Sequence, residues 1–274
     1  MSSENKKFLP YILEGNLDSQ SLLIFLHGYP DSMQLWDSMV EDLKKDHTCL
    51  RISYPNFHPS YKEKWGINFD PLFEKIKELI DFLDEKKGRK KTFVMHDFGA
   101  LIGFSFDCKY PGYLSDIISL DIGLGRDYKP RMKMFLAFIF TMVYQFFLMT
   151  AFLIGGFIGR YMTRSFLYLI KRSGYTPKNE KDIDSSINYM YYYLLRQMII
   201  GVFVKKKRVL YNYKRSCPMA FIFGLNKPFM FHSEKFLRSL MEEEKCEVHA
   251  VKGGHWVMIK HKDLIVDIIQ RRTK

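Results

Sequence analysis

The sequence predicts an α/β fold with a mostly parallel central sheet, helices on its flanks and an inserted helical segment. Short apolar runs of strand length alternate with helical patterns, as parallel α/β folds require. The apolar run 92–95 leads straight into His96-Asp97-Phe98-Gly99-Ala100, where we expect a sharp turn from strand to helix. Between Gly123 and Pro218 the alternation stops for about ninety residues, which is too long for a plain loop.

Each expected strand is a short apolar run bounded by turn residues. The expected strands cover residues 21–26, 48–53, 92–96, 116–122, 219–224 and 246–252. The expected helices cover 33–45, 71–87 and 98–109, followed by a terminal helix through Leu264, Ile265, Ile268 and Ile269. In the second helix the apolar residues recur at helical spacing, at Leu72, Phe73, Ile76, Leu79, Ile80 and Leu83.

Length and composition fit one enzyme-sized domain, because 274 residues with an apolar fraction of 47% can form a sizeable core. The four cysteines, at 49, 108, 217 and 246, show no metal or redox spacing, so we expect no metal site. Residues 1–7 do not resemble a secretory signal. We therefore expect an intracellular, reducing compartment; the organelle is open, and a mitochondrial location is one option.

The chain is basic, with 42 Lys and Arg against 30 Asp and Glu and a net charge of +12. Part of this charge lies in runs at 205–208 and 271–274. Such runs are either solvated faces or contacts for anionic lipid. Since no nucleic-acid motif accompanies them, we expect no nucleic-acid partner.

The strand-to-helix turn at Asp97 favours a chemical role. At such an elbow the reacting side chain lies at the tip of a strained bend, where backbone N–H groups and the helix N-terminus favour negative charge. A serine there indicates acyl transfer, whereas an aspartate favours attack on an alkyl carbon. The alternative is that Asp97 only caps the helix.

Two further motifs flank this turn. The first strand ends in His27-Gly28-Tyr29-Pro30, and the last strand runs into Gly253-Gly254-His255-Trp256. Together with His96-Asp97-Phe98-Gly99 they resemble the α/β-hydrolase fold, in its epoxide hydrolase and haloalkane dehalogenase branch. The loop at 53–58, Ser-Tyr-Pro-Asn-Phe-His, departs from the family pattern. The resemblance implies a hydrolase core over 1–123 and 216–274, with a hydrophobic helical cap over 124–215.

The resemblance also implies roles for individual residues. Asp97 matches the nucleophile, which forms an ester with the substrate, and His255 matches the base that activates water to hydrolyse that ester. The backbone N–H groups of Tyr29 and Phe98 match the oxyanion hole. No metal or organic cofactor is implied.

The acid that orients the histidine is the difficult position. Many members place an aspartate in the turn after the strand at 219–224, where this chain has Lys227. Some place the acid after the preceding strand, where this chain has Asp121, our candidate; the alternative is an aspartate that only ends the strand. Asn226 could also orient His255, without charge. Met95 is a second departure, because the elbow usually favours a small residue there.

Two positions indicate that the leaving group is not a halide, because their side chains lack the expected hydrogen-bond donors. Dehalogenases hold the halide with a tryptophan after the nucleophile and often an asparagine in the first loop, but these positions are Phe98 and Tyr29 here. Epoxide opening needs a proton donor to the ring oxygen, and the cap is rich in tyrosine at 189–193. We expect Tyr192 or Tyr193 to donate; the alternative is that these aromatic residues only pack.

The cap contains an almost wholly apolar segment, 134–158, with basic residues on both sides. By length it could cross a bilayer. One simple crossing would separate His255 from Asp97, so the segment would have to fold back at Gly155-Gly156, return through 191–204, or lie in the membrane interface. The soluble alternative is a buried hairpin in the cap.

Two functions follow from these residues. The first is an epoxide hydrolase-like enzyme for a lipophilic substrate, associated with a membrane through 134–158. The alternative is a catalytically degenerate hydrolase fold that serves as a structural subunit of a membrane-bound complex.

Overall fold

The computed structural model describes residues 8–85, 87–125, 132–172, 174–203, 213–227 and 230–273. Within them the chain forms a seven-stranded sheet in the order β1-β3-β2-β4-β5-β6-β7. β1 runs antiparallel to β3 and the other neighbouring pairs are parallel. The strands are β1 (Tyr11–Gly15), β2 (Ser21–Leu26), β3 (Thr48–Ile52), β4 (Lys90–His96), β5 (Asp116–Leu120), β6 (Met219–Gly224) and β7 (Glu247–Val251).

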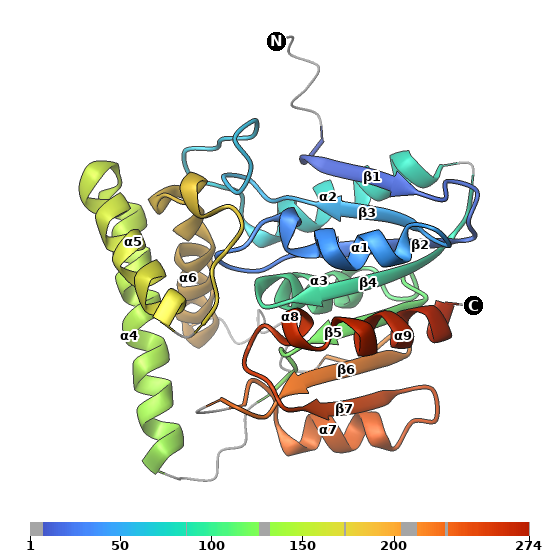
Figure 1. The fold of residues 1–274 in the computed structure, drawn as a ribbon. Helices are drawn as coiled ribbons and strands as arrows, with labels where there is room; N and C mark the ends of the chain where they lie inside the picture. Colours follow the sequence, from blue (N-terminus) through green and yellow to red (C-terminus); the bar gives the residue numbers. More distant parts are fainter. Residues whose placement is uncertain are drawn as a thin grey trace.

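Helices cover both faces of the sheet, which is why β2, β3, β5 and β6 are buried along their whole length. α2 (Phe69–Asp84), α3 (Phe98–Lys109) and α7 (Glu234–Met241) pack into one apolar cluster with the sheet. A short η2 (Met33–Trp36), α1 (Asp37–Leu43), α8 (Val257–Lys260) and α9 (Lys262–Thr273) pack into the other. Figure 1 shows α1 and α9 in front of the sheet and α2 and α3 behind it.

The predicted fold class is confirmed, and most predicted elements lie within a few residues of their observed bounds. The predicted apolar stripe of α2 is buried except for Leu83, which is partly buried. The helix begins earlier than predicted because the Asn68 side chain accepts the Phe69 N–H at 2.9 Å. β1 and α7 were not predicted. β1 is a partly exposed edge strand whose apolar run covers only three residues, 11–13, and α7 has only eight residues.

The chain between β5 and β6 forms a separate group of helices, which we call the cap. The cap contains α4 (Met132–Ile154), α5 (Gly156–Arg172), η3 (Glu180–Asp182), η4 (Ser185–Asn188) and α6 (Tyr189–Phe203). α4 packs against both α5 and α6. In Figure 1 these helices stand at the left, beyond the carboxyl ends of the parallel strands.

The apolar segment 134–158 is not one continuous helix. α4 ends at Ile154, Gly155 and Gly156 have φ values of 63° and 54°, and α5 then packs along α4. Such positive φ values suit glycine, which has no Cβ to clash. The segment therefore folds back at the glycine pair, and among the described residues no helix has the length and apolar character needed to cross a membrane.

Candidate active site

The turn at Asp97 has the geometry of a nucleophile elbow. β4 ends at His96, α3 begins at Phe98, and Asp97 between them has a φ of 52°, which is unusual for a residue with a side chain. Two glycines make room for it. A Cβ on Gly28 would lie 2.2 Å from the Asp97 Cβ, and a Cβ on Gly99 would lie 2.2 Å from the Leu26 carbonyl oxygen.

Met95, which departs from the small residue expected near the elbow, is accommodated by a third glycine. Its side chain is fully buried between β4 and α3. A Cβ on Gly103 of α3 would lie 2.3 Å from the Met95 Sδ. Gly103, which has no side chain, thus leaves room in α3 for the large side chain of Met95.

Asp97, Asp121 and His255 meet at the carboxyl ends of the parallel strands. The Nε2 of His255 lies 3.3 Å from Oδ2 of Asp97, and its Nδ1 lies 2.6 Å from Oδ2 of Asp121. Asp121 directly follows β5, with a φ of 68°, and His255 lies in the loop between β7 and α8. The structure therefore brings together the predicted nucleophile, acid and base in hydrogen-bonding order.

Lys227 joins this group. Its ammonium contacts Oδ1 of Asp121, and the backbone N–H of Gly224 donates to the same oxygen at 3.0 Å. The Lys227 side chain is 5% exposed. Asn226 is exposed, and the Nδ1 of His255 already faces Asp121. The lysine at the expected acid position thus pairs with Asp121.

The charges in this cluster shift its pKa values in opposite directions. Burial alone would lower the pKa of His255, but hydrogen bonds to Asp121 and Asp97 and the charges of both raise it to about 9. Burial would raise the pKa of Asp97 and Asp121, but the hydrogen bond and charge of His255 hold both below the usual range. Burial lowers the pKa of Lys227, although Asp121 opposes this. The resting site is thus an imidazolium between two carboxylates.

The predicted oxyanion donors lie beside Asp97. The Tyr29 N–H donates to Oδ1 of Asp97 at 2.8 Å. Phe98 is the first residue of α3, and the first N–H groups of a helix have no acceptor within the helix. The Tyr29 hydroxyl points elsewhere and donates to Oδ1 of Asn188 in η4 at 2.9 Å.

The structure places a different cap tyrosine at the site from those predicted. Tyr192 packs against Trp65 and Phe152, and Tyr193 packs against Tyr189. Tyr191, by contrast, contacts the rings of Tyr29 and Phe98 with centroids 4.9 and 5.1 Å apart.

Tyr191 is joined at this place by Tyr144 of α4. Burial raises the pKa of Tyr191, and the charges of Tyr144 and Asp97 raise it further. The rings of Tyr144 and Tyr191 have centroids 5.9 Å apart and meet edge to face. The cap tyrosine beside Tyr29 and Phe98 therefore comes from α6, and a tyrosine of α4 packs against it.

Asp31 is a buried acid near the site that the sequence analysis missed. It accepts hydrogen bonds from the Tyr175 hydroxyl and, at 2.8 Å, from the Trp256 indole N–H. The rings of Tyr175 and Trp256 stack with centroids 4.1 Å apart. Burial raises the pKa of Asp31 to about 6. The one sequence signal that could have identified Asp31 as a residue near the site is its place directly after the His27–Pro30 motif.

A buried histidine supports the loop that carries the base. The Nε2 of His96 lies 3.1 Å from the backbone oxygen of His255. Burial and the charge of His255 lower the pKa of His96 to about 3, so its ring is neutral and can donate this hydrogen bond. His96 thereby fixes the backbone at His255.

The loop at 53–58, which departs from the family pattern, has a structural role. Asn56 is buried with a φ of 69°. Its amide nitrogen donates to the carbonyl oxygens of Glu63 and Ser186 at 2.9 and 3.1 Å. The loop therefore ties the core to the cap.

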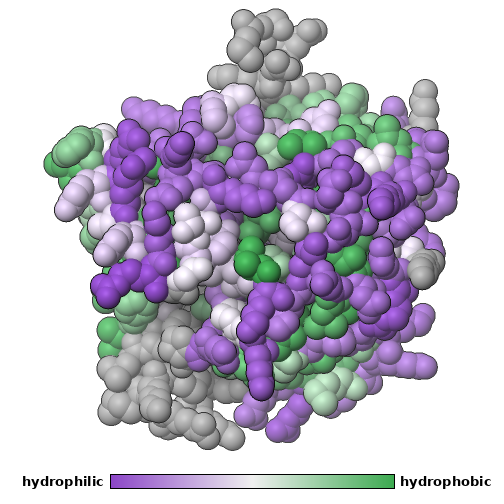
Figure 2. All heavy atoms as spheres, viewed as in Figure 1, coloured by the Kyte–Doolittle hydropathy of each residue, from purple (hydrophilic) through white to green (hydrophobic). Residues whose placement is uncertain are grey.

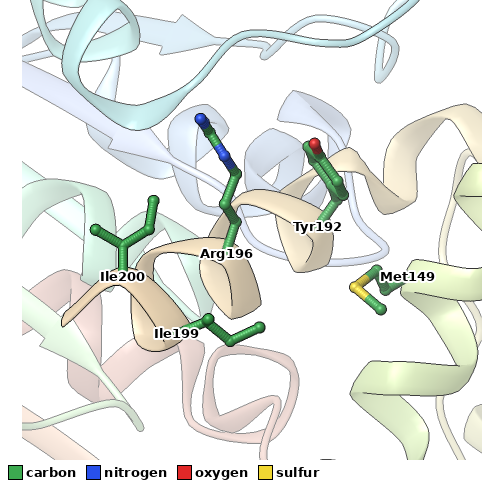
Figure 3. Close-up of a pocket in the computed structure, with 5 residues that line it drawn as sticks. All are labelled: Met149, Tyr192, Arg196, Ile199 and Ile200. Carbon is green, nitrogen blue, oxygen red and sulfur yellow. The ribbon is translucent and has the colours of Figure 1, made fainter. Parts of the chain in front are cut away.

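A cavity of about 330 Å³ opens in the cap, but it lies apart from the catalytic cluster. Met149 of α4 and four residues of α6 line it: Tyr192, Arg196, Ile199 and Ile200. Figure 3 shows Arg196 and Tyr192 projecting from one side of α6 and Met149 facing it from α4. Among the described residues no three His, Cys, Asp or Glu side chains are placed to hold a metal ion.

The sheet, the elbow and the order of the catalytic residues define an α/β hydrolase. The chain belongs to the alpha/beta hydrolase fold family, whose family model matches residues 21–262. The resemblance seen in the three sequence motifs is therefore confirmed at the level of family and fold.

Particular relatives are more distant. Epoxide hydrolase 1 of Caenorhabditis elegans is 29% identical over 116 residues, which are 42% of this chain and 28% of that protein. Epoxide hydrolase 2 of the same organism is 30% identical over 95 residues, 34% of this chain and 25% of that protein. The chain thus matches about a quarter of the length of these relatives. A Bacillus megaterium epoxide hydrolase solved with an inhibitor superimposes with a TM-score of 0.68 at 18% identity, over 96% of each chain, and so shares the fold.

Proposed function

We propose that this protein hydrolyses a lipophilic epoxide through an ester intermediate on Asp97. The observation that carries the proposal is an aspartate carboxylate at the elbow, 3.3 Å from the imidazole of His255. A carboxylate in this place is an oxygen nucleophile toward carbon, whereas esterases and lipases of this fold use serine.

In the first step an oxygen of Asp97 attacks an epoxide carbon and the ring C–O bond breaks. The ring oxygen then takes a proton from a cap tyrosine, and the positions of Tyr144 and Tyr191 support these two residues as donors. Because Asp97 becomes a neutral ester, His255 loses one of the two charges that raise its pKa. The lower pKa allows the imidazolium of His255 to give its proton to the tyrosinate left by this step, which restores the tyrosine hydroxyl and leaves a neutral imidazole as the base.

In the second step His255 takes a proton from water, and the hydroxide attacks the carbonyl carbon of the Asp97 ester. The N–H groups of Tyr29 and Phe98 stabilise the oxyanion that forms. Collapse of this intermediate releases the diol and regenerates the Asp97 carboxylate with one oxygen from water. His255 keeps the proton taken from water and so returns to the imidazolium of the resting site, which Asp121 stabilises.

The surroundings of Asp97 support an epoxide with apolar substituents. The rings of Tyr29, Phe98 and Tyr191 pack against one another there. Phe98 replaces the tryptophan whose N–H holds a halide in dehalogenases, so the side chain offers no donor to a leaving halide. An alkoxide that can take a proton from tyrosine is the better match.

The proposal predicts that oxygen from water enters Asp97. Purified protein would be incubated with a panel of lipophilic epoxides in oxygen-18 water, and the peptide containing Asp97 would be analysed by mass spectrometry. We expect label in Asp97 after many turnovers. His255→Gln is expected to stop after the first step, so that this peptide gains the mass of one substrate molecule.

Asp97→Ala is the control, which should show neither turnover nor adduct while remaining folded. Turnover by wild-type protein without label in Asp97 would contradict the ester mechanism. The absence of both turnover and adduct across the whole panel would contradict the enzymatic proposal. The predicted structural-subunit function, which no specific observation favours, would then be the one to test.

A further inference from the structure

The outer side of the α4–α5 hairpin carries a continuous set of exposed apolar side chains. Of the 22 large hydrophobic residues exposed among the described ones, 12 lie on these two helices. We call them the hairpin face: Ile139, Phe140, Val143, Phe146, Phe147, Leu153, Ile154, Phe157, Ile158, Tyr161, Tyr168 and Leu169.

The spacing of the hairpin face shows that each helix is apolar on more than its core side. On α5 the side packed toward the protein carries Gly159, Thr163 and Leu167, which are buried. The exposed Phe157, Tyr161 and Tyr168 recur at helical spacing on another side. A soluble surface helix would carry polar residues there, so this amount of exposed apolar area indicates an interaction surface.

The hairpin tip contains Phe157, the most exposed side chain of the hairpin face. Leu153, Ile154, Phe157 and Ile158 flank the glycine turn and are 51%, 53%, 85% and 59% exposed. Figure 2 shows green, apolar side chains at the upper left, where α4 meets α5, beside strongly hydrophilic ones. Large apolar groups on both sides of a tight turn can enter an apolar medium together.

The charged side chains of the α4–α5 hairpin itself all have one sign. No Asp or Glu occurs between Tyr128 and Asn179, whereas Arg160, Arg164 and Arg172 are exposed on α5. The segment 124–215 contains 17 Lys and Arg against 4 Asp and Glu, and the remainder of the chain contains 25 against 26. The segment 124–215 therefore carries the whole net positive charge of the protein. Its basic run 205–208 lies outside the described residues.

We propose that the hairpin face docks on a membrane surface rich in acidic phospholipid. Its apolar side chains enter the boundary between head groups and acyl chains, and the arginines lie at the lipid phosphates. A second copy of this chain is a poorer occupant, because two faces with the same strong positive charge would repel each other. The proposal does not depend on the reaction at Asp97.

The test measures co-sedimentation of the full chain with vesicles of phosphatidylcholine, with and without phosphatidylserine. We expect binding to the acidic vesicles that weakens as salt is added. Phe157→Ser with Ile158→Ser should weaken this binding by about tenfold or more, because each side chain loses apolar area that leaves water on docking. Arg160→Gln with Arg164→Gln should weaken it by about fivefold per arginine, and only where phosphatidylserine is present.

Met241→Ser with Ile259→Ser is the matched control, because these residues are as exposed but lie on α7 and α8. This control should bind like wild type. Phe157→Trp adds a direct probe, whose fluorescence should be quenched by brominated lipid only when the tip is inserted. Circular dichroism would establish that each variant is folded.

Two results would overturn the proposal. One is the absence of binding to acidic vesicles, or binding that the tip variant and the control reduce equally. The other is a wild-type dimer in lipid-free solution that Phe157→Ser converts to a monomer, since the hairpin face would then be an interface between copies.

Discussion

At the scale of single residues, the contact between Lys227 and Asp121 sets the charge that acts on His255. Asp121 faces two cations, His255 on Oδ2 and Lys227 on Oδ1. A carboxylate already paired with an ammonium attracts a second cation less strongly. Lys227 therefore limits how far Asp121 raises the pKa of His255, and so keeps the base closer to the pH at which it can accept a proton.

Lys227→Met is expected to raise the pKa of His255 above its present value of about 9, by about half a unit to one unit. The measurement is an NMR titration of protein labelled with carbon-13 histidine, which needs no substrate. Lys227→Arg keeps the charge and should leave the titration close to wild type. An unchanged His255 titration in Lys227→Met would mean that the ammonium has no electrostatic effect on the base.

The candidate catalytic residues were predictable because each lies in a local motif at a strand end. Asp97 and His255 follow strands in recognisable turns, and Asp121 could be chosen from its place after β5. The contact of Lys227 with Asp121 joins residues 106 positions apart and has no local signal. For a similar reason Tyr191, which contacts Tyr29 and Phe98, was not among the tyrosines chosen from the sequence, because a run of tyrosines does not reveal which side of α6 faces Asp97.

At the scale of elements, β4 and α3 pack together because a large side chain on the strand lies opposite a glycine on the helix. The Met95 side chain occupies the space above Gly103. Gly103→Ala should therefore cost about 1–3 kcal/mol in the wild-type protein, since a Cβ would overlap the methionine sulfur. In Met95→Ala the same change should be neutral or stabilise by up to about 1 kcal/mol, because alanine is the better helix former.

A double-mutant cycle, measured by urea denaturation, gives the coupling between the two positions. Equal effects of Gly103→Ala in both backgrounds would show that the two side chains do not compete for space.

Element bounds were predictable where a local signal marks both ends. α3 begins after the Asp97 turn and ends at Lys109, as predicted. β1 escaped prediction because its apolar run is only three residues long and its pairing with β3 has no local signal. The fold-back at Gly155-Gly156 was one of several alternatives, and packing of α4 against α5 and α6 decided among them.

At the scale of the whole molecule, the charge cluster at the strand ends links stability to pH. The folded-state pKa of His255 is raised to about 9 from the ordinary 6.5, so the folded protein holds this proton more tightly than the unfolded chain. The resulting stabilisation is fully present below about pH 6.5 and is lost as the pH rises through about 9.

We therefore expect the free energy of unfolding of wild type to fall by about 2–3 kcal/mol, relative to His255→Gln, between about pH 6 and pH 10. Urea denaturation of both proteins across this range measures the difference. Parallel pH profiles would contradict the charge assignment for the resting site.

The cluster of Asp31, Tyr175 and Trp256 connects the position of the cap to the loop that carries His255. Tyr175 belongs to the cap, Trp256 directly follows the base, and Asp31 holds both. If the cap swings away to admit a bulky molecule, Tyr175 must leave this cluster, and the loop of His255 loses a support. The loop of His255 is then fully supported only while the cap is closed, so under the proposed mechanism bulk water does not reach the supported His255 before a substrate is enclosed.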